Sequence, residues 1–226
     1  MIFDSQAAKD RIFSKIRASQ GRSQDSKAAE LASSEAYLVA KSLGPQPSSP
    51  KDLLQLFVER SIQMSSTVDV LDSSEAIAPA IENYLNAGQL QKAAVVWPAL
   101  QGHGWIDALA GKGVSLRFGA PHGDDLVGVS GVLSAVAETG TLVMASGPET
   151  PASTHLLPET HIALVAASQV VLTMEQAFSR ARALPGGLPR ALNFVSGPSR
   201  TGDIEQTIVL GAHGPYRVHI LLLKDC

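Results

Sequence analysis

The sequence predicts an α/β protein in which a mixed sheet is flanked by helices. From residue 51 onward, short apolar runs of strand length alternate with segments whose apolar residues recur at helical spacing. Residues 162–166 and 170–172 are apolar on both faces, which is typical of strands covered by helices on either side. A proline-rich segment separates this part from a polar N-terminal stretch, so we expect a helical extension in front of the α/β domain.

The N-terminal stretch, residues 4–43, is predicted to form one polar helix. Its apolar positions are loosely spaced, so we expect it to pack on a neighbour or partner and not to form a core. These positions include Ile12, Ile16, Leu31 and Leu38. Three prolines within residues 45–50 cannot continue a helix. The prediction is therefore an extension with its linker over residues 1–50 and one domain over residues 51–226.

Within the domain, helices are predicted where apolar residues recur at helical spacing, namely at residues 51–64, 74–86, 105–110 and 173–183. Gly88 is a typical helix stop, and Thr173 with Gln176 has the spacing of a capping box. Strands are predicted at residues 67–71, 93–97, 114–118, 132–137, 141–145, 162–166, 170–172, 192–195, 207–210 and 217–223. The terminal strands could make part of the sheet antiparallel.

Composition excludes several classes of protein. The 226 residues carry a formal charge of −3 and no long basic run, which argues against nucleic acid or an anionic membrane surface as partner. Charges interrupt every short apolar run near the N-terminus, so neither a signal peptide nor a membrane span is predicted, and a cytoplasmic location is expected. The single cysteine, Cys226, excludes an internal disulfide and any Cys-ligated iron–sulfur cluster or zinc site built from this chain alone.

The densest group of functional residue types lies in the segment SGPSRTGDIE, residues 196–205. It follows an apolar strand, and ligands of open α/β sheets bind at the carboxyl ends of strands. Its glycines permit close backbone approach, its hydroxyls donate hydrogen bonds, and Arg200 offers a planar cation for a phosphate or carboxylate. The alternative is a tight turn capped by its own side chains, since no standard phosphate-loop spacing is present.

Two further residues are candidates for proton transfer. Glu138 stands at a turn between apolar strands and could act as a general base or nucleophile if it is partly desolvated. His213 lies between small residues just after a strand and could transfer protons near neutral pH. The alternatives are a solvated turn carboxylate and a turn histidine without a task.

Other motifs are missing from the sequence. There is no GxGxxG after a strand, no GxxxxGK[ST] and no GxSxG, so dinucleotide-dependent dehydrogenation and P-loop hydrolysis lose their usual support. No histidine pair has HExxH spacing, and no metal is predicted, although a site assembled from distant residues stays open. The remaining histidines are His103, His122, His155, His161 and His219.

Four ordered segments resemble one known family. They are AETGTLV at residues 137–143, LPETHIALV at 157–165, SGPSRTGDIE at 196–205 and LGAHGP at 210–215. Together they are similar to the lactate utilization protein C family, whose members carry a LUD domain. Gly202 stands where that family commonly has Ala, and Ala212 stands where it has Val. Residues before about 125 match the family only in general pattern.

The resemblance implies a fold like that of NagB, RpiA and the CoA transferases, and a place in a set of three bacterial proteins that convert L-lactate to pyruvate. The two companion subunits of that set carry iron–sulfur clusters, so no cofactor is expected in this chain. We expect a small carboxylate or phosphate-bearing ligand in a cleft, with Glu138 or His213 handling any proton. The expected ligand-binding residues are Thr139, Gly140, Ser196, Gly197, Ser199, Arg200, Thr201, Asp203 and Glu205.

Two other functions remain open. One is a stand-alone transferase or cyclo-ligase that acts on a CoA-linked or phosphorylated acid; it predicts turnover by the purified chain. The other is an assembly or regulatory module; it predicts tight complex formation that survives mutation of Glu138, Arg200 and His213. The first is weakened by the missing nucleotide and metal motifs, and the second by the clustering of polar residues.

Overall fold

The computed structural model describes residues 5–21, 26–40, 44–46, 52–201 and 209–224. By its contacts the chain forms two units, Met1–Gln46 and Pro47–Cys226.

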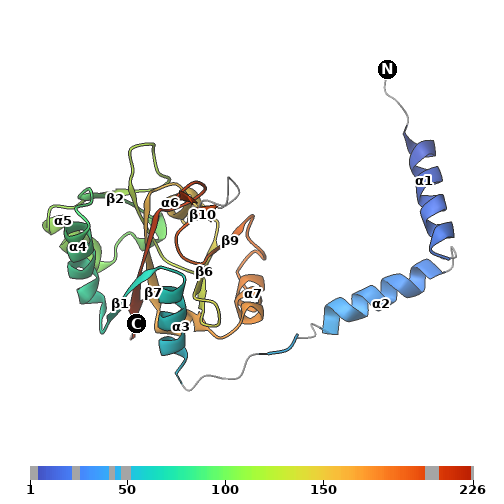
Figure 1. Ribbon diagram of the computed structural model, residues 1–226, viewed down its shortest axis with the longest axis horizontal. Coiled ribbons are helices and arrows are strands. Elements are labelled where there is room, and N and C mark those ends of the chain that lie inside the picture. Colours follow the sequence, from blue (N-terminus) through green and yellow to red (C-terminus); the bar gives the residue numbers. More distant parts are fainter. Residues whose placement is uncertain (1–4, 22–25, 41–43, 47–51, 202–208, 225–226) are drawn as a thin grey trace. The chain divides into compact units, whose positions relative to one another are not determined.

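The first unit contains two helices, α1 (Gln6–Ser19) and α2 (Ser26–Ala40), so the prediction of a single helix over residues 4–43 is wrong (Figure 1). The physical reason is Gly21, whose φ of +66° is left-handed and ends α1 just after Gln20. No residue of α1 is buried, and Ile12, Ile16, Leu31 and Leu38 are all exposed.

The second unit is built on a six-stranded sheet in which every pair of neighbours is parallel. In spatial order its strands are β1 (Thr67–Leu71), β12 (Arg217–Leu223), β7 (Thr160–Ala166), β4 (Val127–Ser130), β2 (Ala93–Val96) and β3 (Ser115–Phe118). The last strand of the chain therefore lies inside the sheet and runs parallel to both neighbours. Of the strands expected near the C-terminal end, β12 therefore adds no antiparallel pairing.

Antiparallel pairing occurs instead in a second, four-stranded sheet. Its order is β8 (Val170–Val171), β5 (Ser134–Val136), β6 (Thr141–Ala145) and β9 (Leu192–Val195). The predicted turn at residues 138–140 joins β5 to β6 as an antiparallel hairpin, and β9 runs antiparallel to β6. A small separate ladder pairs β10 (Arg200–Thr201) with β11 (Val209–Leu210). Residues 207–208 of the strand predicted at 207–210 lie outside the described residues.

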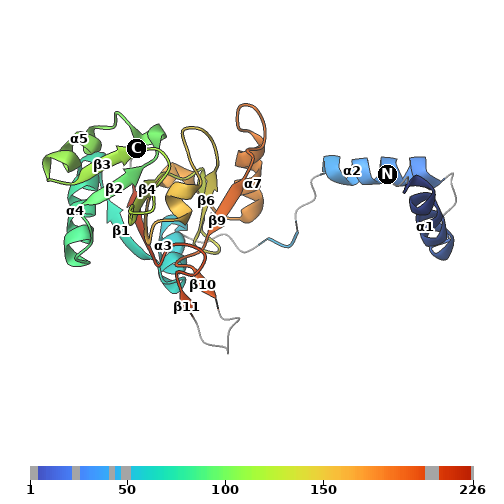
Figure 2. The same ribbon diagram turned by 90° about the horizontal axis from the view of Figure 1, so that it is seen from above.

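Alternation along the parallel strands separates two cores. Leu164 and Leu221 face a core with α4 (Ile77–Ala87) and α5 (Gly104–Gly111), whereas Val165 and Leu222 face a core with α3 (Leu53–Gln63) and the second sheet. The figures show α4 and α5 on one side of the sheet and α3 on the other (Figures 1 and 2). Further elements are α6 (Ser153–Leu156), α7 (Met174–Arg182), η1 (Ser74–Ala76), η2 (Pro98–Leu100) and η3 (Ala167–Gln169).

Local signals explain the helix ends. Asp52 accepts a hydrogen bond from the Gln55 backbone N–H at 2.9 Å and caps α3. The predicted stop at Gly88 is confirmed, because α4 ends at Ala87 with Gly88 as its C-cap. Gln176 Oε1 accepts from the Thr173 backbone N–H at 3.3 Å, so α7 begins where the capping-box spacing places it.

The α/β class with helices in front of the domain is confirmed. The elements that were not predicted include β4 and α6, besides the short β10, η2 and η3. The β4 sequence VGVS contains Gly128 and Ser130 and does not form an apolar run. Gly128 is needed because a Cβ there would lie 2.0 Å from the Thr154 carbonyl oxygen of α6. Among the described residues, no helix is long and apolar enough to cross a membrane.

Candidate functional site

Because the six strands are parallel, their amino ends share one edge of the sheet and their carboxyl ends share the other. The SGPSRT loop was expected at the ligand-binding carboxyl edge. It does follow the carboxyl end of β9, but β9 belongs to the second sheet. The loop packs on Met64 and bonds to Ser65 and Pro215, residues that directly precede β1 and β12. It therefore lies at the amino edge of the parallel sheet, and the expected position is wrong.

Two of the predicted glycines are required by packing at this edge. Gly197 has a φ of +80°, and a Cβ there would lie 2.0 Å from the Met64 carbonyl oxygen. Gly140 has a φ of +63°, and its Cβ would lie 2.5 Å from the Arg60 carbonyl carbon and the Ser61 nitrogen. The β5–β6 turn and the SGPSRT loop thus press their backbones onto the same segment, the end of α3. Only glycine permits this approach at a left-handed φ.

A chain of hydroxyl groups joins the two predicted segments. Thr139 Oγ1 and Thr141 Oγ1 are 2.7 Å apart, and Thr141 Oγ1 is 2.7 Å from Ser196 Oγ. Thr139 and Ser196 are exposed, while Thr141 is buried between them. Thr141 was not among the predicted site residues, although its place in the segment ETGT beside Thr139 was a signal for it.

The remaining motif residues form the outer part of the same cluster. The exposed Arg200 guanidinium donates to Ser65 Oγ. The Ser199 N–H donates to the Pro215 carbonyl at 2.9 Å, and the His213 N–H approaches Ser199 Oγ at 3.4 Å. These contacts bring the SGPSRT and GAHGP segments together at the amino edge. We call Thr139, Thr141, Ser196, Gly197, Ser199, Arg200 and His213, with Ser65, the motif cluster.

Not every candidate joins the motif cluster. Glu138 is exposed, its N–H donates to the Leu172 carbonyl at 3.1 Å, and its carboxylate makes no hydrogen bond to a residue that the structure describes. The Glu138 carboxylate is therefore not desolvated, as a general base at this position was expected to be. Thr201 lies in β10 opposite Val209. Asp203 and Glu205 lie outside the described residues.

Charged and aromatic side chains that sequence reasoning missed lie at the amino ends of the central strands. Arg217 Nε donates to Thr160 Oγ1 at 3.0 Å. His219 Nδ1 lies 2.8 Å from Thr67 Oγ1, and its ring stacks on Tyr84 at 3.9 Å. Burial lowers the pKa of His219 to about 4 and raises the pKa of Tyr84. Near neutral pH this buried histidine is uncharged, so it acts as a hydrogen-bonding residue and not as a cation.

The carboxyl edge carries a pocket that sequence reasoning also missed. Its volume is about 620 Å³, and it opens where β1, β12, β7 and β4 end. Asp72, Glu75 and His103 supply its ionisable groups. The pKa of Glu75 is lowered by the hydroxyl of Ser73 and by the Glu75 backbone N–H. The signal was the polar run DSSE at residues 72–75, which directly follows the first predicted strand.

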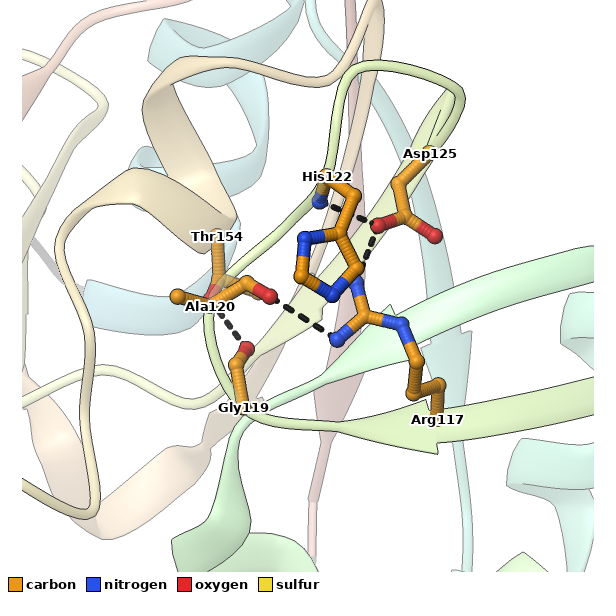
Figure 3. A network of polar contacts seen from close by, with 6 residues as sticks. All are labelled: Arg117, Gly119, Ala120, His122, Asp125 and Thr154. Atoms are coloured by element: carbon orange, nitrogen blue, oxygen red, sulfur yellow. Dashed lines mark hydrogen bonds and ion pairs between the residues drawn. The ribbon is translucent and has the colours of Figure 1, made fainter.

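A polar network orders the loop after β3 (Figure 3). Arg117 donates to the Ala120 carbonyl at 2.9 Å and to Asp125, which also accepts from the His122 N–H. Thr154 Oγ1 donates to the Gly119 carbonyl at 3.1 Å. Burial alone would raise the pKa of Asp125, but the His122 N–H and Arg117 together hold that pKa below its ordinary value. The dashed contacts in Figure 3 join these residues to one another and tie the loop to β3 and α6, which indicates a structural role.

Within the described ranges, no group of three or more His, Cys, Asp or Glu side chains could hold a metal ion. The donors at the motif cluster are hydroxyls, one guanidinium and one exposed imidazole. This set suits an anion held by hydrogen bonds and positive charge.

Comparison with known proteins places this cluster in a family context. Residues 125–223 match the family model described as LUD domain. Lactate utilization protein C of Geobacillus kaustophilus is 37% identical over 134 residues, which cover 57% of this chain and 54% of the relative. Lactate utilization protein C of Bacillus subtilis is 37% identical over 102 residues, covering 44% and 42%. The chain spans about half the length of the curated relatives it matches.

A crystal structure of a DUF162 family protein from Deinococcus radiodurans shares the fold. Its TM-score is 0.57 at 21% sequence identity, and the match covers 79% of this chain and 100% of that one. All four segments that carry the resemblance lie within residues 125–223. Residues 125–223 therefore match the LUD domain family, and the resemblance of this chain to the lactate utilization protein C family is confirmed.

Proposed function

We propose that this chain is the non-redox subunit of a lactate-oxidising system and binds a small carboxylate or phosphate-bearing ligand at the motif cluster. The observation that carries the proposal is that the LUD domain match contains every residue of the motif cluster except Ser65. The chain is also similar to relatives that are named lactate utilization protein C.

The chemistry of lactate oxidation supports a division of labour between subunits. Conversion of L-lactate to pyruvate breaks one C–H and one O–H bond and releases two electrons and two protons. The sequence holds one cysteine and no dinucleotide fingerprint, so it offers no usual acceptor for those electrons. We therefore assign the electrons to iron–sulfur companion subunits and assign binding and orientation of the anion to this chain.

The motif cluster supports anion binding through the side chains it presents to solvent. Arg200 is exposed and can pair with a carboxylate or phosphate, since its guanidinium offers five donors in a planar fork. Ser196 and Thr139 are exposed ends of the hydroxyl chain through Thr141. The exposed His213 imidazole, close to Ser199, is the candidate for proton transfer.

Growth on L-lactate tests this function in the cell. We expect a strain lacking the chain to grow on pyruvate but not on L-lactate, because the block lies before pyruvate. Re-expression of the unchanged chain should restore growth, and Arg200→Ala should restore it poorly. Arg190→Ala is the matched control, because Arg190 is also exposed and precedes β9 outside the motif cluster.

Normal growth of the deletion strain on L-lactate would contradict the proposed function. Full restoration by Arg200→Ala would leave the role in lactate utilization but remove Arg200 from the site. Co-purification provides the second test: the tagged chain should bring down iron–sulfur subunits, and the purified chain alone should not oxidise L-lactate.

A further inference from the structure

The carboxyl-edge pocket has the dimensions and place of a ligand site. Its volume of about 620 Å³ lies within the range that small-molecule sites occupy. A neighbouring cavity of about 340 Å³ shares Glu75, His103 and Trp105 with it. Both lie beside α4 and α5, where the carboxyl ends of parallel strands meet, and this is the edge at which open α/β sheets bind ligands.

The charges at this pocket differ from those at the motif cluster. Asp72 and Glu75 are carboxylates, and the lining residues within the described part of the chain include no lysine or arginine. Lys224 pairs with Asp72 at 3.0 Å, which leaves Glu75 as the carboxylate without a cationic partner among the residues described. An anionic ligand would be repelled here, whereas a cation or a strong hydrogen-bond donor would be attracted.

Most of the pocket wall is apolar, although Ser73, Ser74 and Gln169 also line it. One buried hydrogen-bond donor in this wall lacks a partner among the described residues. Leu100, Leu164 and Leu223 line the pocket, and Trp105 lines both cavities. Trp105 is 4% exposed, and its Nε1–H has no hydrogen-bond partner among the residues that the structure describes. A buried donor without a protein partner is expected where a water or a ligand enters the cavity and completes the bonding. An ammonium group has no lone pair to accept this bond, so beside an amine a water accepts it. This observation is independent of the carboxylates.

We propose that the carboxyl-edge pocket binds a small organic amine whose ring or other apolar body lies against Trp105 and the leucines. Its amino group is held at Glu75. The ligand has the opposite charge from the anion assigned to the motif cluster, so the protein holds two different ligands at opposite edges of one sheet.

Trp105 provides a direct readout of binding, because the chain contains only two tryptophans, Trp97 and Trp105. In a Trp97→Phe protein the emission comes from Trp105 alone. The probes are benzylamine, benzyl alcohol and benzoate, which share one ring and differ in charge. We expect benzylamine to change the emission with roughly millimolar affinity, benzyl alcohol to bind more weakly, and benzoate most weakly.

Two variants locate the amine. Glu75→Gln keeps the size of the side chain and should weaken benzylamine about threefold or more, while leaving benzyl alcohol unchanged. Asp107→Asn is the matched control, since Asp107 is an exposed acid on α5 that does not line the pocket. If Trp97→Phe is unstable through loss of its bond to the Pro151 carbonyl, thermal shift of the otherwise unmutated chain replaces fluorescence.

Three outcomes overturn the proposal. One is benzoate binding as tightly as benzylamine, and another is equal loss of benzylamine affinity in Glu75→Gln and Asp107→Asn. The third is the absence of any response to benzylamine by both fluorescence and thermal shift. None of these outcomes bears on the motif cluster, so failure here is distinct from failure of the proposed function.

Discussion

The two edges of the parallel sheet are built in different ways. At the amino edge the family segments meet, and they do so by pressing glycine backbones onto the end of α3, with exposed polar groups outside. At the carboxyl edge there is no motif in the sequence, yet there is a largely apolar pocket with carboxylates at its rim. A sequence motif thus marks where loops must pack closely, and it does not by itself mark the place of a cavity.

The largest effect is expected from a substitution that disrupts the packing at the amino edge. Gly197→Ala forces a Cβ onto the Met64 carbonyl oxygen at a left-handed φ, so we expect a loss of at least about 3 kcal/mol in the free energy of unfolding. Chemical denaturation measures it. Gly186→Ala is the control, because Gly186 has a φ of +87° but open space around its Cβ position.

Gly186→Ala should cost only the left-handed backbone term, roughly 1–2 kcal/mol. Equal losses in the two variants would show that the close approach of the SGPSRT loop to Met64 does not exist. The comparison between the two edges would then lose its structural basis.

The next effect concerns two buried histidines near the amino end of β7, His155 and His161. Burial lowers the pKa of His155 to about 4, and burial with the neighbouring His155 lowers the pKa of His161 to about 3. Both pKa values in the folded protein lie below the value of about 6.5 in the unfolded chain. The free energy of unfolding therefore has its full value above pH 6.5, and below that pH the unfolded chain gains stability by binding protons. Stability should fall as pH drops from 6.5 toward 4, by about 1.4 kcal/mol per pH unit for each histidine.

His155→Leu sharpens this prediction, because neither ring nitrogen of His155 has a hydrogen-bond partner among the described residues. The variant should show a shallower decline of unfolding free energy between pH 7 and pH 5, by up to about 2 kcal/mol. An unchanged slope would mean that His155 titrates normally. Ligand titrations at either edge therefore belong at a pH above this window.

The smallest expected effect concerns the hydroxyl chain of the motif cluster. Thr141→Val and Ser196→Ala each remove one end of the 2.7 Å contact, and we expect a loss of about 1 kcal/mol from Thr141→Val because Thr141 is buried. In a double-mutant cycle the two changes should couple by about 0.5 kcal/mol or more. Strict additivity would show that the turn and the loop are not energetically joined.

Some elements of the fold were predictable because the residues of the element itself determine its structure. β7 and β12 are apolar runs buried on both faces, and Gly88 ends α4 by its own chemistry. β4 was not predictable, since Gly128 is explained only by the Thr154 carbonyl of a helix that follows it in the chain. Likewise, the sequence does not reveal that β9 joins the second sheet, and this decides which edge holds the SGPSRT loop.

For the candidate site, the sequence indicated which residues lie close together better than it indicated which edge of the sheet they occupy. Ser196, Ser199, Arg200, His213 and Thr139 do come together, as their shared resemblance suggested. Glu138 has the right residue type but an exposed setting, and Glu75 was missed because DSSE matches no motif. Burial and partners are tertiary properties, so residue type and spacing alone do not give them.

A thermal-shift titration tests most directly the claim that the motif cluster binds a small anion. L-lactate, pyruvate and inorganic phosphate would be added to the unchanged chain, to Arg200→Ala and to Arg190→Ala, at a pH well above 6.5. A ligand at a hundred times its dissociation constant should add about 2.7 kcal/mol of stability. The account predicts a shift with at least one anion in the unchanged chain and in Arg190→Ala, and none in Arg200→Ala. An equal shift in Arg200→Ala, or no shift with any of the three anions, would contradict it.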